Sequence, residues 1–234
     1  YRMSFWTSLP QKYLAKKLTK ISDVSIVTTK QNKMILSSFN NKKKIIYTNV
    51  FSNVGELSKN KVLKDRKNTA IIFGNTYQKE ILYKDILFNE NKYKKVLKNF
   101  FIEKIIDIGP RVNISKKVRF MKISSIGIKS KKYISSLFKN SKIGFVFYPV
   151  SQMTKSGIVA AYVSHGLIVI NFCDKNIFKS NEFVSGVNYI SDVNSVNDVK
   201  SQKIANEAYK NYQKYGLSKT TLLITRIIDN KKIK

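Results

Sequence analysis

The fold is indicated most clearly by residues 149 to 172, "PVSQMTKSGIVAAYVSHGLIVINF". An apolar run leads into Pro149, and a polar turn, a segment of small residues, Gly166 and a second apolar run follow. This is the order of a βαβ unit, in which a helix connects two parallel strands. Ligands bind to such units where the turn after a strand meets the next helix. The stretch therefore predicts a parallel sheet with a candidate site around Lys155, Ser156 and Gly157.

The same alternation continues on both sides of this stretch. Strands are predicted at 69–74, 104–110, 119–127, 142–149 and 167–172, with helices at 76–100, 130–141 and 201–228. Nearer the N-terminus, helices at 8–20 and 30–39 alternate with strands at 23–29 and 43–51. Pro10 is expected in the first turn of its helix, where proline is tolerated. The fold class is therefore α/β, with parallel sheets covered by helices on both faces.

The segment 52–68, "SNVGELSKNKVLKDRKN", is rich in Asn, Ser and Lys and has almost no periodicity, which is typical of a linker. It divides the chain into three predicted parts. Residues 1–54 form the end of one Rossmann-like domain and the linker, and residues 55–200 form a second Rossmann-like domain. Residues 201–234 form closing helices that pack back toward the first part.

The chain is strongly basic, with a formal net charge of +30. Only 5 of its 44 basic residues are Arg, so 39 are Lys, spread along the chain with abundant Asn and Ile, as expected from an AT-rich genome. Proteins that recognise bases or phosphates usually favour Arg, whose planar group matches them. The charge therefore favours a lysine-solvated surface, with no specific nucleic-acid partner expected. A basic nucleic-acid-binding α/β module stays open as an alternative.

Metal and nucleophile chemistry have few candidates. His165 is the single histidine and Cys173 the single cysteine, which excludes an internal disulfide and a multi-cysteine zinc site. His165 is expected to be a residue at the C-terminal end of a helix, and Cys173 a buried apolar residue. Asp107 lies within an apolar strand and needs a partner such as Arg111 or backbone donors. No run approaches the ~18 apolar residues of a spanning helix, so a cytoplasmic location is expected, with peripheral contact at the inner membrane face as an option.

Two turns are the best candidates for phosphate binding. Gly74, Asn75 and Lys79 follow the strand 69–74, and the alternative there is an ordinary glycine turn with a capped helix. The second turn combines the cap residues Thr154 and Ser156 with Gly157 and the charge of Lys155. A helix N-terminus offers free N–H groups and a partial positive charge that suit an anion, although packing alone would also explain a Ser-Gly start.

The order of "DVSIVTT", "VFSNVGE", "AIIFGNTYQKEILY", "IIDIGP", "GFVFYP", "KSGIVAAYVSHGLIVI" and "YKNYQKYGLSKTT" resembles the C-terminal part of a GT-B glycosyltransferase of the group 1 (GT4-like) family. The resemblance covers nearly the whole chain. It implies that a nucleotide-sugar donor binds in the cleft between two domains, and that its sugar is transferred to a glycan, a lipid-linked acceptor or another acceptor. The nucleotide-sugar is a substrate, so no cofactor is expected.

The resemblance also implies where the donor binds. The expected diphosphate site consists of Gly74, Asn75, Lys79, Lys155, Ser156 and Gly157, with Thr154, Arg111 and Glu182 as neighbours. No Asp-x-Asp occurs in the sequence, so metal-independent transfer and no bound metal are expected. The two glutamates of the family pattern fall on Met153 and Ala161. A second hypothesis is therefore a catalytically silent GT-B-like binding subunit.

Overall fold

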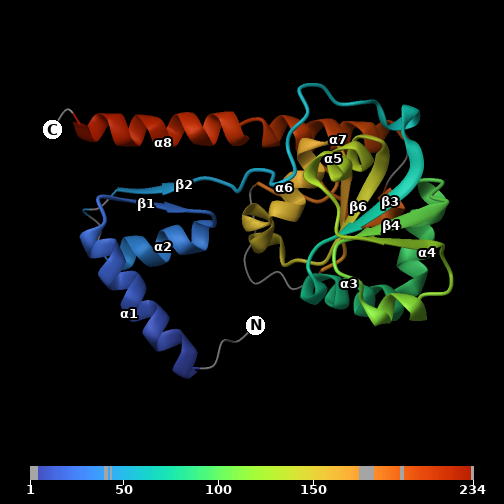
Figure 1. The fold of residues 1–234 in the computed structure, drawn as a ribbon, viewed down its shortest axis with the longest axis horizontal. Coiled ribbons are helices and arrows are strands. Elements are labelled where there is room, and N and C mark those ends of the chain that lie inside the picture. The colour runs from blue at the N-terminus through green and yellow to red at the C-terminus, as the bar shows by residue number, and fades with distance from the viewer. Residues whose placement is uncertain (1–4, 40–41, 43, 174–181, 196–197, 233–234) are drawn as a thin grey trace.

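The computed structural model describes residues 5–39, 42, 44–173, 182–195 and 198–232. Figure 1 shows a small N-terminal unit and a larger C-terminal unit joined by an extended segment that leaves β2. The small unit consists of α1 (Phe5–Ile21), β1 (Val24–Val27), α2 (Lys30–Phe39) and β2 (Lys44–Tyr47). Strands β1 and β2 pair in parallel. The helix α1 begins earlier than predicted, so Pro10 lies inside it, not in its first turn.

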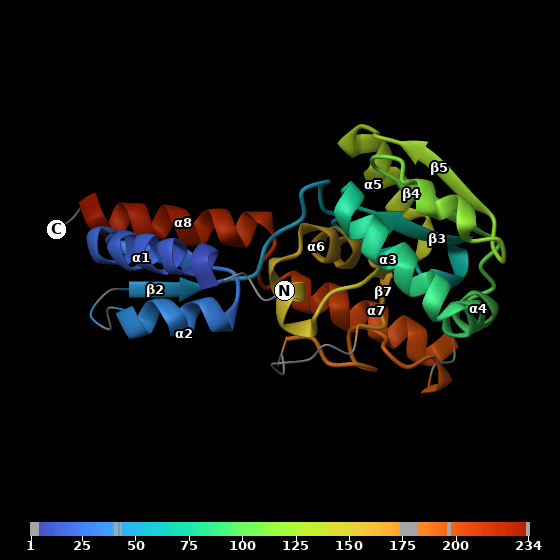
Figure 2. The same ribbon diagram turned by 90° about the horizontal axis from the view of Figure 1, so that it is seen from below.

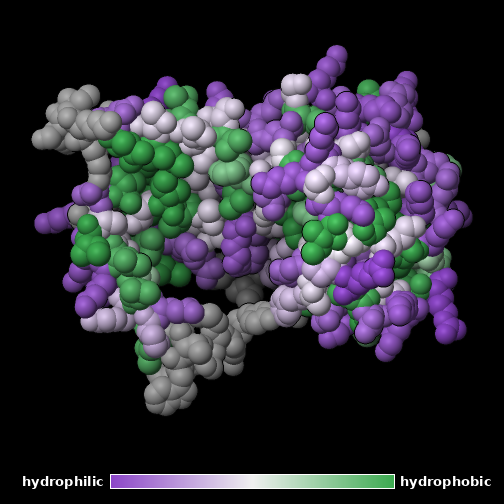
Figure 3. All heavy atoms as spheres, viewed as in Figure 1, coloured by the Kyte–Doolittle hydropathy of each residue, from purple (hydrophilic) through white to green (hydrophobic). Residues whose placement is uncertain are grey.

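Much apolar surface of the small unit is uncovered. Large apolar side chains are exposed on α1, β1 and α2, among them Leu14, Ile21 and Met34. Figure 3 shows such side chains gathered over this unit, whereas the visible face of the larger unit is mostly hydrophilic. In the described ranges, no helix has the length and apolar character needed to cross a membrane.

The larger unit contains the predicted parallel sheet. Its strands are β3 (Lys67–Phe73), β4 (Lys104–Ile108), β5 (Ile123–Gly127), β6 (Ser141–Val146) and β7 (Ile168–Asn171). They lie in the order β5-β4-β3-β6-β7, and every neighbouring pair is parallel. The strand predicted at 119–127 is confirmed only from Ile123 onward. The linker contains one short 3-10 helix, η1 (Leu63–Asp65).

Helices cover both faces of this sheet, as the alternation of the sequence predicts (Figure 2). Successive β3 residues point to opposite faces, so Ile72 packs with α3 (Thr76–Phe88) and α4 (Glu90–Asn99), whereas Ile71 packs with α5 (Lys131–Lys139) and α6 (Gly157–Ser164). The short 3-10 helices η2 (Asn113–Lys117), η3 (Val150–Lys155) and η4 (Val193–Ser195) lie in the connections. The α/β fold class is confirmed.

The two closing helices differ in what they pack against. The helix α7 (Asp198–Tyr212) packs on α6 and β7 of the larger unit, and the predicted boundary at residue 200 falls inside it. The helix α8 (Leu217–Lys232) extends along the small unit (Figures 1 and 2). The Tyr212 hydroxyl and the Leu217 N–H both donate to the Glu56 carboxylate, so the two segments that connect the units are tied together.

Candidate functional site

The site lies where the strand order reverses. Strands β3 and β6 are neighbours, with Ile72 opposite Phe145, but the chain proceeds from β3 toward β4 and from β6 toward β7. The turns that follow these two strands therefore diverge and leave a crevice at the carboxyl end of the sheet. In open parallel sheets this is where ligands bind.

The β3 turn supplies the first wall. Asn75 caps α3, because its side-chain oxygen accepts a hydrogen bond from the Gln78 N–H at 2.9 Å. Gly74 lies close to the opposite wall, since a Cβ added there would be 3.0 Å from Cδ1 of Ile158 on α6. The two turns predicted as phosphate sites thus face each other.

The β6 turn supplies the second wall through η3 and α6. The Ser156 hydroxyl caps α6 by accepting from the Val159 N–H at 3.2 Å. Gly157 is the first residue of the helix, and a Cβ added there would meet only the side chain of Asn53, at 3.8 Å. The Lys155 side chain is exposed, and its ammonium makes no hydrogen bond or ion pair with any described residue. This end of α6 therefore offers open space, N–H donors and an exposed ammonium group.

A pocket of about 460 Å³ separates the two walls. Five of the predicted residues line it: Gly74, Asn75, Lys155, Ser156 and Gly157. The sequence argument missed the other polar lining residues, which are Asn53, Gln78, Tyr148 and Gln152. Tyr148 and Gln152 lie in the same turn as Lys155, so they could have been found by treating every polar residue of that turn as a candidate. Asn53 comes from the linker, and only the fold brings it to the pocket.

Asn171, at the end of β7, supports the β6 turn through hydrogen bonds to its backbone. The sequence argument did not select this residue. Its side chain is fully buried, accepts from the Tyr148 N–H at 3.1 Å and donates to the Tyr148 carbonyl at 2.8 Å. Burial raises the pKa of Tyr148, and a hydrogen bond with Ser156 opposes that rise. An asparagine ending an apolar strand was the available signal for this support.

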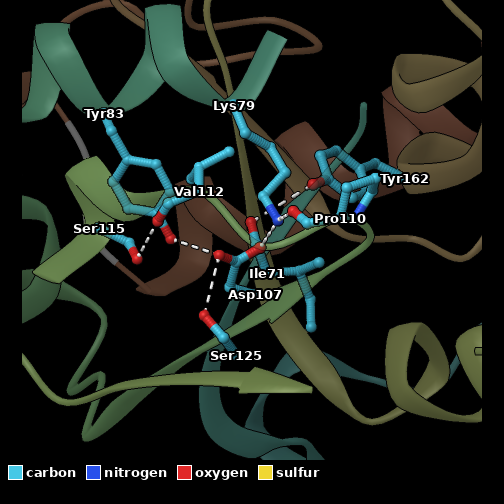
Figure 4. Close-up of polar contacts among 9 residues, drawn as sticks. All are labelled: Ile71, Lys79, Tyr83, Asp107, Pro110, Val112, Ser115, Ser125 and Tyr162. Atoms are coloured by element: carbon cyan, nitrogen blue, oxygen red, sulfur yellow. Dashed lines mark hydrogen bonds and ion pairs between the residues drawn. The ribbon is translucent and has the colours of Figure 1, made fainter. Parts of the chain in front are cut away.

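Lys79 is not part of the pocket wall. Its side chain is 1% exposed, and its Nζ lies 2.5 Å from the Asp107 carboxylate and donates to the Pro110 carbonyl (Figure 4). Asp107 therefore has a partner, as predicted, but that partner is Lys79 and not the suggested Arg111 or backbone donors. Lys79 shares a helix face with Leu82, Tyr83 and Ile86, at the spacing of a buried stripe.

The predicted neighbours of the site lie elsewhere. Thr154 is buried and donates to the Thr28 carbonyl of the small unit at 2.8 Å. Arg111 lines a separate hollow of about 590 Å³ beside β5. Glu182 pairs with Lys30 of the small unit at 2.9 Å. Thr154 and Glu182 thus connect the two units, and none of the three lines the pocket.

His165 and Cys173 are both buried. His165 follows α6 as its C-cap, as predicted. Its Nδ1 is 2.8 Å from the Ala161 carbonyl, which can only accept, so Nδ1 carries the proton and the neutral ring accepts from Ser135 at Nε2. Burial lowers the pKa of His165, and the hydrogen bond to the Ala161 carbonyl opposes that shift. Neither residue lines the pocket.

Two further observations bear on the site. Within the residues that the structure describes, no three or more His, Cys, Asp or Glu side chains lie together as a metal site would require.

A larger hollow, of about 670 Å³, lies where β4 begins and includes Lys98, Phe101 and Lys104. It is at the amino end of the sheet, away from the ligand-binding edge of such folds, so we assign the site to the smaller pocket.

Comparison with known proteins supports the fold. No protein-family model matches the sequence, and no curated protein matches it either. Among solved structures, sucrose-phosphate synthase from Thermosynechococcus elongatus superposes with a TM-score of 0.66 at 8% identity, over 100% of this chain and 65% of that one. A TarM mutant from S. aureus, in complex with fondaparinux, alpha-GlcNAc-glycerol and UDP, gives 0.58 at 14% identity, over 93% and 45%.

The alpha-glucosyltransferase AGT in complex with UDP gives a TM-score of 0.52 at 11% identity, over 92% of this chain and 67% of that one. This chain thus spans between about half and two thirds of the length of these three proteins. They are GT-B glycosyltransferases, and the chain has their α/β architecture. At such low identity the likeness shows the fold alone.

Proposed function

We propose that the protein is a group 1 (GT4-like) GT-B glycosyltransferase that binds the diphosphate of a nucleotide-sugar between the β3 and β6 turns. The observation that carries this proposal is their convergence on one pocket at the strand-order reversal. Five residues selected from the sequence as phosphate contacts line that pocket. The fold of UDP-bound neighbours supports the same conclusion.

The chemistry of the pocket suits a diphosphate. The N-terminus of α6 and Lys155 supply positive charge, and none of the lining residues is a carboxylate that would repel an anion. The same groups would stabilise the charge that develops on a departing nucleoside diphosphate. Transfer then needs no metal, and the acceptor is a glycan, a lipid-linked glycan or another nucleophile, with an anionic membrane as a candidate peripheral surface.

A second candidate function is donor binding without transfer. Met153 and Ala161, on which the glutamates of the family pattern fall, are both buried, at 1% and 0% exposure, and neither lines the pocket. No lining carboxylate replaces them. The lack of a lining carboxylate favours a silent subunit, which would bind the donor without consuming it.

A ligand screen tests the proposal. The melting temperature is measured with UDP, GDP and CDP, and with their sugar conjugates. A ligand at 100 times its Kd stabilises the folded protein by about 2.7 kcal/mol. At least one nucleoside diphosphate should raise the melting temperature, and a screen without any shift would contradict the proposal.

Turnover separates the two candidates. The donor that binds is incubated with glycan, lipid-linked and DNA acceptors, the last because a structural neighbour was solved with UDP and a 13-mer DNA containing a HMU base. Sugar release or transfer supports the enzyme. Binding with no turnover supports the silent subunit.

A further inference from the structure

A buried ion pair lies directly behind the β3 turn. The side chains of Lys79 and Asp107 are 1% and 0% exposed, and Nζ is 2.5 Å from the carboxylate. The other carboxylate oxygen of Asp107 accepts from the Tyr83 hydroxyl at 2.9 Å and from the Ser125 hydroxyl at 3.2 Å. Figure 4 shows these groups converging from α3, β4 and β5.

The ion pair joins the elements that shape one wall of the pocket. Lys79 lies one helical turn after Asn75, the N-cap of α3, and its ammonium also donates to the Pro110 carbonyl just beyond β4. Beside it the two turns touch, because a Cβ added to Gly109 would lie 2.3 Å from the Gly74 carbonyl oxygen. The β3 turn therefore takes its position from the β4 turn, and the pair fixes that contact.

Stability alone does not explain such a pair. Taking two charges out of water is costly, and replacing a buried ion pair by uncharged groups of similar volume is often neutral or stabilising. The pair is also electrically neutral as a unit, and its ammonium contacts Asp107 and Pro110, neither of which lines the pocket. What the ion pair does provide is a geometric constraint, because it sets the distance and orientation of α3 relative to β4.

We propose that Lys79 and Asp107 are positioning residues for the donor pocket. They hold the β3 turn in the conformation in which Gly74 and Asn75 receive the diphosphate, and neither touches it. This inference rests on the proposed function, because it concerns the same pocket.

The double variant Lys79→Met/Asp107→Asn tests the inference. It removes both charges while keeping side-chain volume, so its melting temperature should stay near that of the unaltered protein. The Kd for the nucleoside diphosphate that binds best is expected to rise about tenfold, as when groups that orient a binding site are removed. The control is Glu90→Gln/Lys94→Met, which removes an exposed 2.5 Å pair on α4 and should leave Kd unchanged.

If the ion pair only stabilised the fold, the Kd would rise only when the melting temperature falls. An unchanged Kd in a double variant that keeps its melting temperature would therefore overturn the inference. The dependence of Kd on salt should also stay the same, because Lys155, the charged residue lining the pocket, is unaltered. A shallower dependence would mean that Lys79 contacts the ligand, which contradicts a positioning role.

If the double variant does not fold, Tyr83→Phe keeps the inference testable. It removes the hydroxyl that orients Asp107 and leaves the buried ring in place. The Kd is expected to rise about threefold, and an unchanged Kd would overturn the inference. The proposed function fails separately, when the unaltered protein binds no nucleoside diphosphate.

Discussion

Two glycines at the ends of neighbouring strands offer a sharp test of how the pocket is built. Gly109 follows β4 with φ of 108°, and Gly127 ends β5 with φ of 71°, so both adopt backbone conformations that other residues rarely take. Their surroundings differ. A Cβ on Gly109 would lie 2.3 Å from the Gly74 carbonyl oxygen, whereas a Cβ on Gly127 would have no neighbour within 4 Å.

The expected costs follow from this difference. Gly127→Ala is expected to lower the unfolding free energy by about 1–2 kcal/mol, the cost of its backbone conformation alone. Gly109→Ala adds a collision with rigid backbone that needs a shift of about 1 Å, at a further cost of about 1–3 kcal/mol. Because the atom that must move belongs to the β3 turn, we expect Gly109→Ala to weaken donor binding, whereas Gly127→Ala should not.

Urea denaturation measures the unfolding free energies, and calorimetric titration with the nucleoside diphosphate measures the Kd. Both are run on the two variants and the unaltered protein. Equal losses of stability, together with an unchanged Kd for Gly109→Ala, would refute the close contact between the two turns and the positioning drawn from it.

Three further predictions concern the site and its surroundings. Gly157→Ala should leave the melting temperature equal or higher, since the new Cβ meets only Asn53 at 3.8 Å. It should weaken donor binding, because the methyl group occupies pocket space. An unchanged affinity would place the ligand elsewhere. Chelation with EDTA should change neither donor binding nor turnover, and restoration of activity by added metal would contradict this. Burial lowers the pKa of His165, so the unfolded chain takes up a proton first as the pH falls through about 6.5. The unaltered protein should thus lose more stability between pH 7.5 and 5 than His165→Asn, and equal losses in denaturation would contradict the buried neutral ring.

Much of the fold follows from local pattern. Apolar runs ending in Gly or Pro predicted four of the five strands of the larger sheet, and Ser156 and Gly157 predicted the start of α6 within one residue. The two candidate turns could be chosen because parallel strands place their carboxyl ends at one edge of the sheet. The strand order was not predictable, since pairing of β3 with β6 depends on contacts between residues about 70 positions apart.

The prediction for Lys79 shows where a local argument was insufficient. Its distance from Gly74 suggested a phosphate contact, but its helical spacing with Leu82 and Tyr83 placed it on the buried face of α3. Asp107 was recognised as a charge needing a partner, and the partner lies 28 residues earlier in the chain. Arg111, which was suggested as that partner, lines a separate hollow beside β5.

The most direct measurement compares Ser156→Asp with Ser156→Asn. Both residues cap helices about as well as serine, so α6 should be retained, and the variants differ only in one negative charge. At about 6 Å and an effective dielectric constant of about 20, that charge opposes each phosphate charge by about 2.8 kcal/mol. Calorimetric titration should therefore show donor binding close to that of the unaltered protein for Ser156→Asn and at least a hundredfold loss for Ser156→Asp. Equal affinities for the two variants would contradict diphosphate binding between the β3 and β6 turns.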